Sequence, residues 1–201
     1  MSFYQQIAVI GPKLFIKKST LMKYGFNLSP MYRCSTAYVT DVSDDLLTIK
    51  IKLPISYKNR NYVNSIFGGS MFSAVDPIPM VQLINILEDN DPTTSTTTDD
   101  FVVWDKSAII NFKKPAKEDL YATFTFSNDE INTIKSRVQN ENEIEIIKTN
   151  TLTNVDETVT FCEVHKTIYI ANIDYYKTKL EQKRRKQVQQ RQHQQPQQSK
   201  L

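Results

Sequence analysis

Glycine is scarce in this chain of 201 residues, and so are the side chains that form disulfides or bind metals. The sequence contains four glycines, two cysteines, two histidines and one tryptophan. Four scattered glycines are too few for the phosphate-binding loops of nucleotide-binding folds. Two cysteines cannot build a disulfide scaffold, and they indicate a protein of a reducing compartment.

The two histidines do not complete a catalytic or metal-binding group. Cys162 and His165 lie three residues apart in a predicted strand, so their side chains face opposite sides of it. His193 lies in a glutamine-rich tail. We therefore expect no metal site and no cofactor.

Charge is unevenly distributed along the sequence, although the net charge is only +3. Residues 174–201 carry eight basic and two acidic side chains, which gives +6, and the rest of the chain carries −3. The body has no basic face typical of nucleic-acid binding. No apolar run approaches the ~18–20 residues of a transmembrane helix, so we expect no membrane span.

The last three residues match a known targeting signal. Ser199, Lys200 and Leu201 match the C-terminal tripeptide that the peroxisomal import receptor binds. The glutamine-rich segment before them predicts disorder, which would leave the tripeptide accessible. We expect peroxisomal localisation through this receptor, with a cytoplasmic location as the alternative.

The hydrophobic pattern predicts an α+β fold with an antiparallel sheet around one buried helix. Predicted helices cover 14–25, 70–87, 127–138 and 175–190, and predicted strands cover 36–42, 46–53, 101–112, 120–126, 143–151 and 158–171. Predicted loops lie at 91–100 and 139–143. Three regions follow: an N-terminal helical segment (1–33), one domain (34–173) and a basic tail (174–201).

The chemistry is expected where two glycines open the buried helix. The free N–H groups of Gly68 and Gly69 would favour an anion or an oxyanion, although close packing explains these glycines equally well. Asp76 follows in the same apolar segment, where an acid needs a partner or a role. It is either a catalytic carboxylate or an N-cap before Pro77.

Two blocks of sequence carry a resemblance to a known family. They read N-Y-V-N-S-I-F-G-G-S-M-F-S-A-V-D-P from residue 61 and V-V-W-D-K-S-A-I-I-N-F-K-K-P-A from residue 102. Over residues 20–171 the chain resembles the hotdog-fold acyl-CoA thioesterases of the phenylacetate-pathway type. It is most similar to an uncharacterised branch catalogued as a domain of unknown function. The resemblance implies a hotdog fold, in which an antiparallel sheet wraps a long helix.

The resemblance also implies roles for individual residues. The N–H of Gly68, with Gly69 beside it, would polarise the thioester carbonyl. Asp76 would be the general base or the nucleophile, and Asn61 would hold the attacking water or the acid. Asp105 matches a polar residue on the strand after the helix, although an ion pair with its neighbour Lys106 would explain it too.

Three departures from the family pattern affect this site. Phe67 replaces a histidine, and it is either a pocket wall or a core residue. Asn64 replaces a glycine, and Pro77 and Pro79 would interrupt the helix.

The spacing of Gly68 and Asp76 bears on the oligomeric state. Eight residues separate them, or ~12 Å along one helix, so they cannot meet one carbonyl in the same subunit. In hotdog dimers the site forms between subunits, which implies a homodimer or a dimer of dimers. We predict a thioesterase that hydrolyses acyl-CoA to a free acid and CoA. The alternatives are a non-catalytic hotdog protein that binds acyl-CoA or lipid, and an interaction protein that acts through its basic tail.

Overall fold

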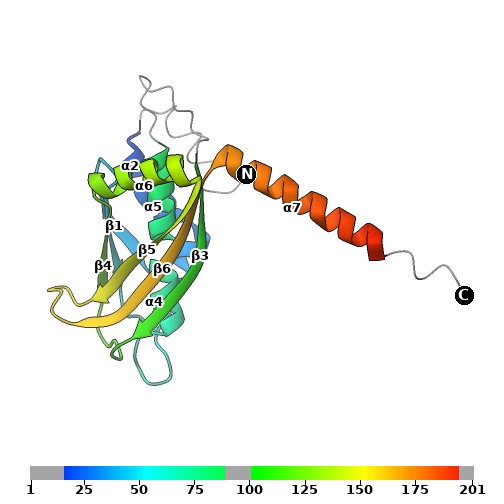
Figure 1. The fold of residues 1–201 in the computed structure, drawn as a ribbon. Helices are drawn as coiled ribbons and strands as arrows, with labels where there is room; N and C mark the ends of the chain where they lie inside the picture. Colours follow the sequence, from blue (N-terminus) through cyan, green and yellow to red (C-terminus); the bar gives the residue numbers. More distant parts are fainter. Residues whose placement is uncertain (1–15, 89–100, 195–201) are drawn as a thin grey trace, which may run out of the picture.

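One antiparallel sheet forms the frame of the molecule (Figure 1). The computed structural model describes residues 16–88 and 101–194. Within these ranges the six strands lie in the order β1-β2-β4-β5-β6-β3, which makes β1 and β3 the edge strands. The strands are β1 (Tyr38–Val42), β2 (Thr48–Leu53), β3 (Phe101–Phe112), β4 (Leu120–Thr125), β5 (Glu143–Thr153) and β6 (Thr160–Asn172).

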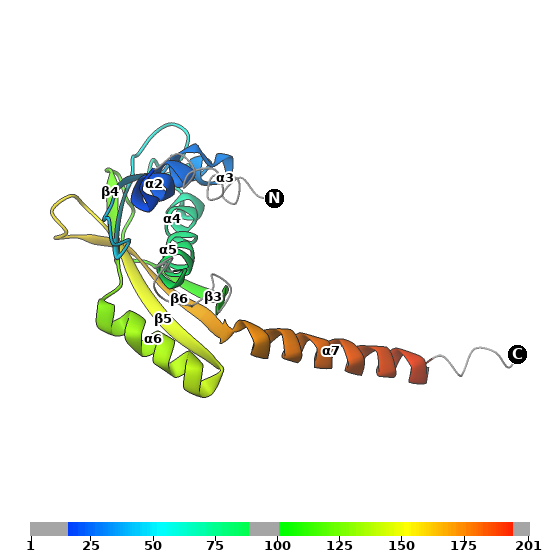
Figure 2. The same cartoon turned by 90° about the horizontal axis from the view of Figure 1, so that it is seen from above.

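The sheet curves around a central helix that has two segments, α4 and α5 (Figure 2). The helices are α2 (Lys18–Leu28), α3 (Pro30–Arg33), α4 (Gly68–Val75), α5 (Ile78–Leu87), α6 (Asn128–Glu141) and α7 (Ile173–Gln194). Helix α2 packs against β1, and α5 packs against β3. The predicted α+β architecture, a long helix inside an antiparallel sheet, is confirmed.

The core lies between the concave face of the sheet and the central helix. Along β2, Ile49, Ile51 and Leu53 are buried, while the lysines between them are not. Ala74 and Ile78 of the central helix are fully buried in the same cluster. Burial of this apolar surface is the main favourable term in folding.

The central helix is also the one helix among the described residues that is long and apolar enough to cross a membrane. The segment Gly68–Leu87 spans 20 residues with a mean hydropathy of 1.3. The core helix of a folded domain meets the same criterion of length and composition. Here the sheet wraps the helix, and side chains along both segments are buried in the core.

The first helix ends later than predicted. Helix α2 continues through Gly25, the expected end, to Leu28. Ser29 then adopts an extended backbone, and Pro30 opens α3. Proline disfavours the helical conformation in the residue before it, so the Ser29–Pro30 pair ends the helix.

Two further differences concern a helix and a loop. The predicted helix 70–87 is divided by a turn at Asp76–Pro77, because prolines 77 and 79 lack the N–H that a continuous helix needs. The predicted loop 139–143 is reduced to Asn142, whose φ of 65° suits asparagine and reverses the chain into β5. The predicted loop at 91–100 lies outside the described residues.

Helix α6 lies where the sheet opens. Strands β4 and β5 pair only at Tyr121↔Thr153, so they diverge, and α6 packs there against β5. Ser127 caps α6 as predicted, because its Oγ accepts a hydrogen bond from the Glu130 N–H at 3.1 Å. The Glu130 carboxylate does not complete a capping box; it binds the ammonium of Lys148 at 2.9 Å.

Helix α7 projects from the end of β6, away from the body of the molecule (Figure 1). Its first turns are held by Glu143, whose carboxylate accepts hydrogen bonds from Tyr169 Oη (2.5 Å) and Tyr175 Oη (3.3 Å) and pairs with Lys179. The Lys179 ammonium is the main reason why the pKa of Glu143 is lowered. Because its pKa is lowered, ionised Glu143 contributes fully to the stability of the fold at pH values above 4.5, its ordinary pKa. This contribution is lost as the pH falls through the lowered pKa of Glu143.

Substitution Glu143→Gln should loosen the base of α7. The neutral amide loses the pairing with Lys179, and the partly exposed site limits the loss in unfolding free energy to at most about 1 kcal/mol. Amide hydrogen exchange in the first two turns of α7 should become faster. Glu141→Gln is the matched control, because Glu141 pairs with Arg137 within α6. Equal exchange rates in α7 for both variants would contradict this role.

Candidate functional site

A buried lysine joins the two acids that the sequence analysis selected. The ammonium of Lys166 lies 2.5 Å from Asp76 Oδ1 and 2.9 Å from Asp105 Oδ2. The Lys166 side chain is 2% exposed, whereas Asp76 is 40% exposed and Asp105 is 26% exposed. The lysine is therefore internal, and the two carboxylates form the accessible side of the cluster.

Three elements bring these residues together. Lys166 lies in the middle of β6 on the inward face, between Val164 and Ile168. Asp76 ends α4 at the break in the central helix. Asp105 lies on β3 opposite Ile168, directly before an irregularity in the β3–β6 register. The helix break and the strand irregularity thus face each other across the lysine.

The cluster excludes one of the two alternatives for each acid. Asp76 does not act as a side-chain cap for α5, because its carboxylate binds Lys166 instead. Asp105 does not pair with its neighbour Lys106, which binds Glu145. Each acid therefore points to the same internal ammonium.

Asp105 has an unusual environment for a carboxylate. Its Oδ1 is buried without a hydrogen-bond partner among the described residues. Burial raises the pKa of Asp105, the Lys166 ammonium opposes this effect, and the nearby Asp76 charge adds to it. With two carboxylates around one ammonium, the cluster carries a net charge of −1 when both acids are ionised.

The two glycines lie at the other end of α4. Gly68 and Gly69 begin the helix, and neither N–H has an acceptor among the described residues. Two aromatic rings lie against these glycines. A β-carbon at position 68 would come within 2.7 Å of the Phe112 ring, and one at position 69 within 2.3 Å of the Phe67 ring. Close packing and open donors therefore occur together, and a larger residue at either position would displace a ring.

Phe67 is a surface residue and not a core residue. Its side chain is 57% exposed. The ring covers the start of α4 from outside, which fits a wall of the site better than core packing.

Asn61 does not lie in the acid cluster. Its Oδ1 accepts hydrogen bonds from the N–H groups of Val63 (3.1 Å) and Ser65 (3.0 Å), and its Nδ2 donates to Ser65 Oγ (2.9 Å). These bonds close the loop before α4. Asn64 in this loop has a φ of 59°, which explains how asparagine replaces the family's glycine.

Cys162 and His165 do not belong to the acid cluster. Cys162 is buried, and burial raises the pKa of its thiol to about 11. His165 contacts Glu163 and Thr149 instead. Among the described residues no three metal-binding side chains lie together. The targeting residues 199–201 lie outside the described part of the chain.

Lys166 is the member of the acid cluster that the sequence analysis missed. A signal was present, because the alternating pattern of β6 places Lys166 on the same face as the apolar Val164, Ile168 and Ile170. A lysine in an apolar stripe is rarely fully buried without a partner. The pattern did not show which acids would meet it, since both are distant in sequence.

Comparison with known proteins identifies the family of this chain. Residues 18–170 match the family described as Domain of unknown function (DUF4442). No curated protein matches the chain.

Two similar solved structures are both of proteins of unknown function. One, from Pseudomonas aeruginosa, is named a probable thioesterase; it is 15% identical over 72% of this chain and 89% of that chain, with a TM-score of 0.60. The other, from Chlorobaculum tepidum, is 13% identical over 74% and 91%, with a TM-score of 0.56. At these identities the likeness concerns the fold. The chain therefore belongs to the DUF4442 family and has the hotdog fold of thioesterase structures.

Proposed function

We propose that this protein is an acyl-CoA thioesterase that acts as a homodimer or a dimer of dimers. The observation that carries the proposal is that Asp76 is bound to a buried lysine and is still exposed to solvent. One oxygen of this carboxylate is held by the buried Lys166 ammonium, while 40% of the side chain stays exposed. The carboxylate is thus fixed in direction and still able to accept a proton from a bound water.

The proposed reaction is hydrolysis with Asp76 as general base. Asp76 removes a proton from water, and the water oxygen forms a bond to the thioester carbonyl carbon. The carbon–sulfur bond then breaks, and the CoA sulfur takes the proton. The products are a free acid and CoA. Lys166 does not react in this scheme; it holds the carboxylate and balances its charge.

The start of α4 supplies the second requirement, a site for the developing oxyanion. The N–H groups of Gly68 and Gly69 point out of the first helical turn, where the helix dipole adds positive potential. Donors of this kind stabilise the negative oxygen of a tetrahedral intermediate. The rings of Phe67 and Phe112 lie beside these glycines and place apolar surface next to the donors.

A second subunit would bring the donors to the acid. In one chain, Gly68 lies beside Phe112 at one end of β3, and Asp76 is linked through Lys166 to Asp105 in the other half of this strand. β3 is an edge strand. Antiparallel pairing of two β3 edges would place the Phe112 end of one strand beside the Asp105 half of the other. The partner subunit's Gly68 would then approach Asp76.

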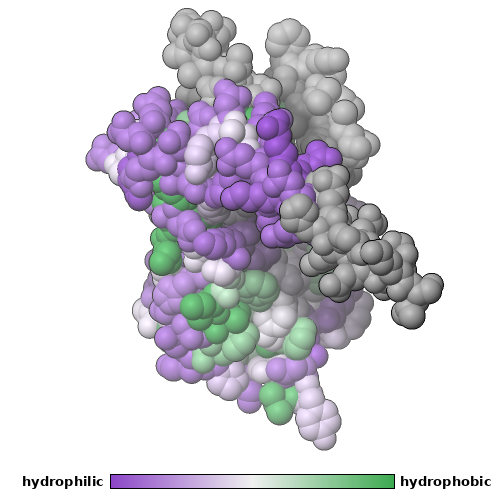
Figure 3. Space-filling model, turned by 45° about the vertical axis from the view of Figure 1, so that its right-hand side comes forward, coloured by the Kyte–Doolittle hydropathy of each residue, from purple (hydrophilic) through white to green (hydrophobic). Residues whose placement is uncertain are grey.

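The surface around β3 supports this pairing. Ile109 and Phe112 are exposed on the strand, and Phe67 is exposed beside it. Figure 3 shows hydrophobic surface gathered on the lower part of the face turned toward the viewer, below the hydrophilic region. Exposed apolar patches next to an unpaired strand edge are typical of a protein interface.

One observation favours a second candidate, a hotdog protein that binds acyl-CoA without hydrolysing it. The Phe67 ring packs closely over Gly69, where the better-known thioesterases have a histidine. A ring in this position favours binding of an acyl chain and donates no hydrogen bond. Saturable acyl-CoA binding without turnover would establish this function.

Substitution Asp76→Asn should lower the hydrolysis of short-, medium- or long-chain acyl-CoA by about 100-fold or more, because it removes the proton acceptor. Product CoA should be measured by chromatography, since the exposed Cys34 would react with thiol dyes. Asp119→Asn is the control, because Asp119 pairs with Lys52 outside the acid cluster. Unchanged turnover in a folded, dimeric Asp76→Asn protein would refute the role of this residue.

Substitution Lys166→Met should impair both stability and turnover. Removal of the ammonium leaves two carboxylates without their counter-charge, and loss of one partner from a buried ion pair costs about 3 kcal/mol. The double variant Lys166→Met/Asp105→Asn should recover part of the stability and none of the turnover. Denaturant unfolding and CoA release measure the two effects.

Lys148→Met is the matched control for the lysine. Lys148 is the register partner of Lys166 on β5, but it binds Glu130. This variant should keep its turnover. Equal loss of turnover in the Lys148 and Lys166 variants would refute the proposed role of Lys166 in holding the Asp76 carboxylate.

We also propose that the C-terminal tripeptide directs the protein to peroxisomes. A chain with an N-terminal fluorescent tag should co-localise with a peroxisomal marker, and deletion of Ser199, Lys200 and Leu201 should make it cytosolic. Lys183→Ala is a control that changes the basic tail but not the tripeptide. Peroxisomal location after the deletion would refute the proposal.

A further inference from the structure

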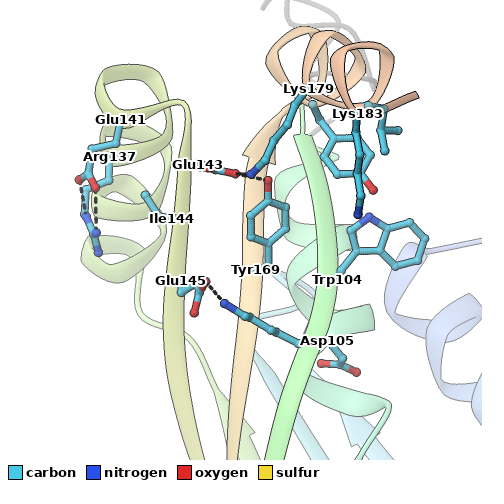
Figure 4. A pocket seen from close by; sticks show the side chains of 13 residues that line it. Trp104, Asp105, Arg137, Glu141, Glu143, Ile144, Glu145, Tyr169, Lys179 and Lys183 are labelled. Atoms are coloured by element: carbon cyan, nitrogen blue, oxygen red, sulfur yellow. Dashed lines mark hydrogen bonds and ion pairs between the residues drawn. The ribbon is translucent and has the colours of Figure 1, made fainter. Parts of the chain in front are cut away.

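A groove lies outside the acid cluster, on the outer face of the sheet between α6 and α7 (Figure 4). Its volume is about 920 Å³. Trp104 and Tyr169 are neighbours on β3 and β6 in its floor. The wall formed by α7 contributes Tyr176, Lys179 and Lys183. The family match ends at residue 170, so the α7 wall lies beyond the matched residues.

Four acidic and four basic side chains line the groove, and each except one has an oppositely charged partner. Lys179 pairs with Glu143, and Lys106 pairs with Glu145. Lys183 has no acidic partner among the residues that the structure describes. In Figure 4 its side chain extends from α7 toward the ring of Trp104. A bound anionic group would give Lys183 the partner that it lacks.

The floor of the groove offers an aromatic platform beside this ammonium. Trp104 is 55% exposed although it lies in the middle of a strand pair. An exposed indole stacks well on a nucleobase, because every base presents a flat π face. A planar ring joined to phosphate matches an indole beside an unpaired ammonium, whereas an acyl chain would leave the ammonium without a partner.

We propose that this groove binds the 3′-phosphorylated ADP end of CoA, with adenine on Trp104 and a phosphate at Lys183. The assignment to CoA depends on the proposed thioesterase function. It is supported by Asp105, which lines the groove and also binds Lys166 in the acid cluster. Asp105 therefore belongs to both the groove lining and the cluster, and the flexible arm between nucleotide and thioester would pass this part of the edge strand β3.

Trp104 is the only tryptophan of the chain, so its fluorescence reports binding directly. Titration of the full-length protein with 3′-phosphoadenosine 5′-diphosphate should quench the emission in a saturable way, and CoA should do the same. ADP should bind at least about tenfold more weakly, because it lacks the 3′-phosphate. Equal affinity for ADP would overturn the assignment to CoA in favour of a free adenine nucleotide.

Two charge-reversal variants test the geometry. Lys183→Glu should weaken binding of 3′-phosphoadenosine 5′-diphosphate by at least about tenfold. Arg185→Glu makes the same change in net charge two residues later on the helix, outside the groove, and should have little effect. Equal weakening by both variants, or no saturable quenching in the unchanged protein, would overturn the proposal. Trp104→Ala, measured by calorimetry, should lose most of the affinity while the protein stays folded.

The test is independent of hydrolysis. Nucleotide binding should persist in Asp76→Asn, because that residue does not line the groove. Binding without turnover on any acyl-CoA would refute the proposed hydrolysis and leave the groove as a nucleotide site. Turnover without nucleotide binding would refute the groove proposal alone.

Discussion

The arrangement of the site depends on one buried ammonium. Lys166 is almost completely removed from solvent, and its desolvation is tolerated because two carboxylates lie within hydrogen-bonding distance. This requirement fixes the position of the helix break at Asp76 relative to the middle of β6. It also draws Asp105 inward on β3. A charged group inside the core therefore determines how the central helix and an edge strand meet.

Strand β3 connects the features that the proposed function requires. Its inward face carries Asp105, its outer face carries Trp104, and its Phe112 end lies over the start of α4. Its free edge is available to a second subunit. Side chains alternate along a strand, so the neighbouring residues Trp104 and Asp105 point to opposite sides of the sheet.

Local pattern was enough to predict most of the fold, because apolar periodicity and turn residues determine the elements and their order. The strand 101–112 has the predicted limits. Gly25 misled the prediction, since its small size serves burial in α2 and not termination. At the site, the special residues Gly68 and Asp76 were visible in the sequence. The contact between Asp76 and Lys166 was not visible, because it joins residues 90 positions apart and depends on tertiary packing.

The junction between β6 and α7 has a consequence for the assembly. Helix α7 starts directly after the strand, and Asn172 Oδ1 accepts the N–H groups of Asp174 and Tyr175, so no flexible linker separates the helix from the sheet. Its 22 residues make an arm of ~33 Å. A twofold pair of chains would hold two such basic arms at a constant separation. Such a dimer would contact a binding surface through two arms at once, and its overall affinity would exceed that of a single arm.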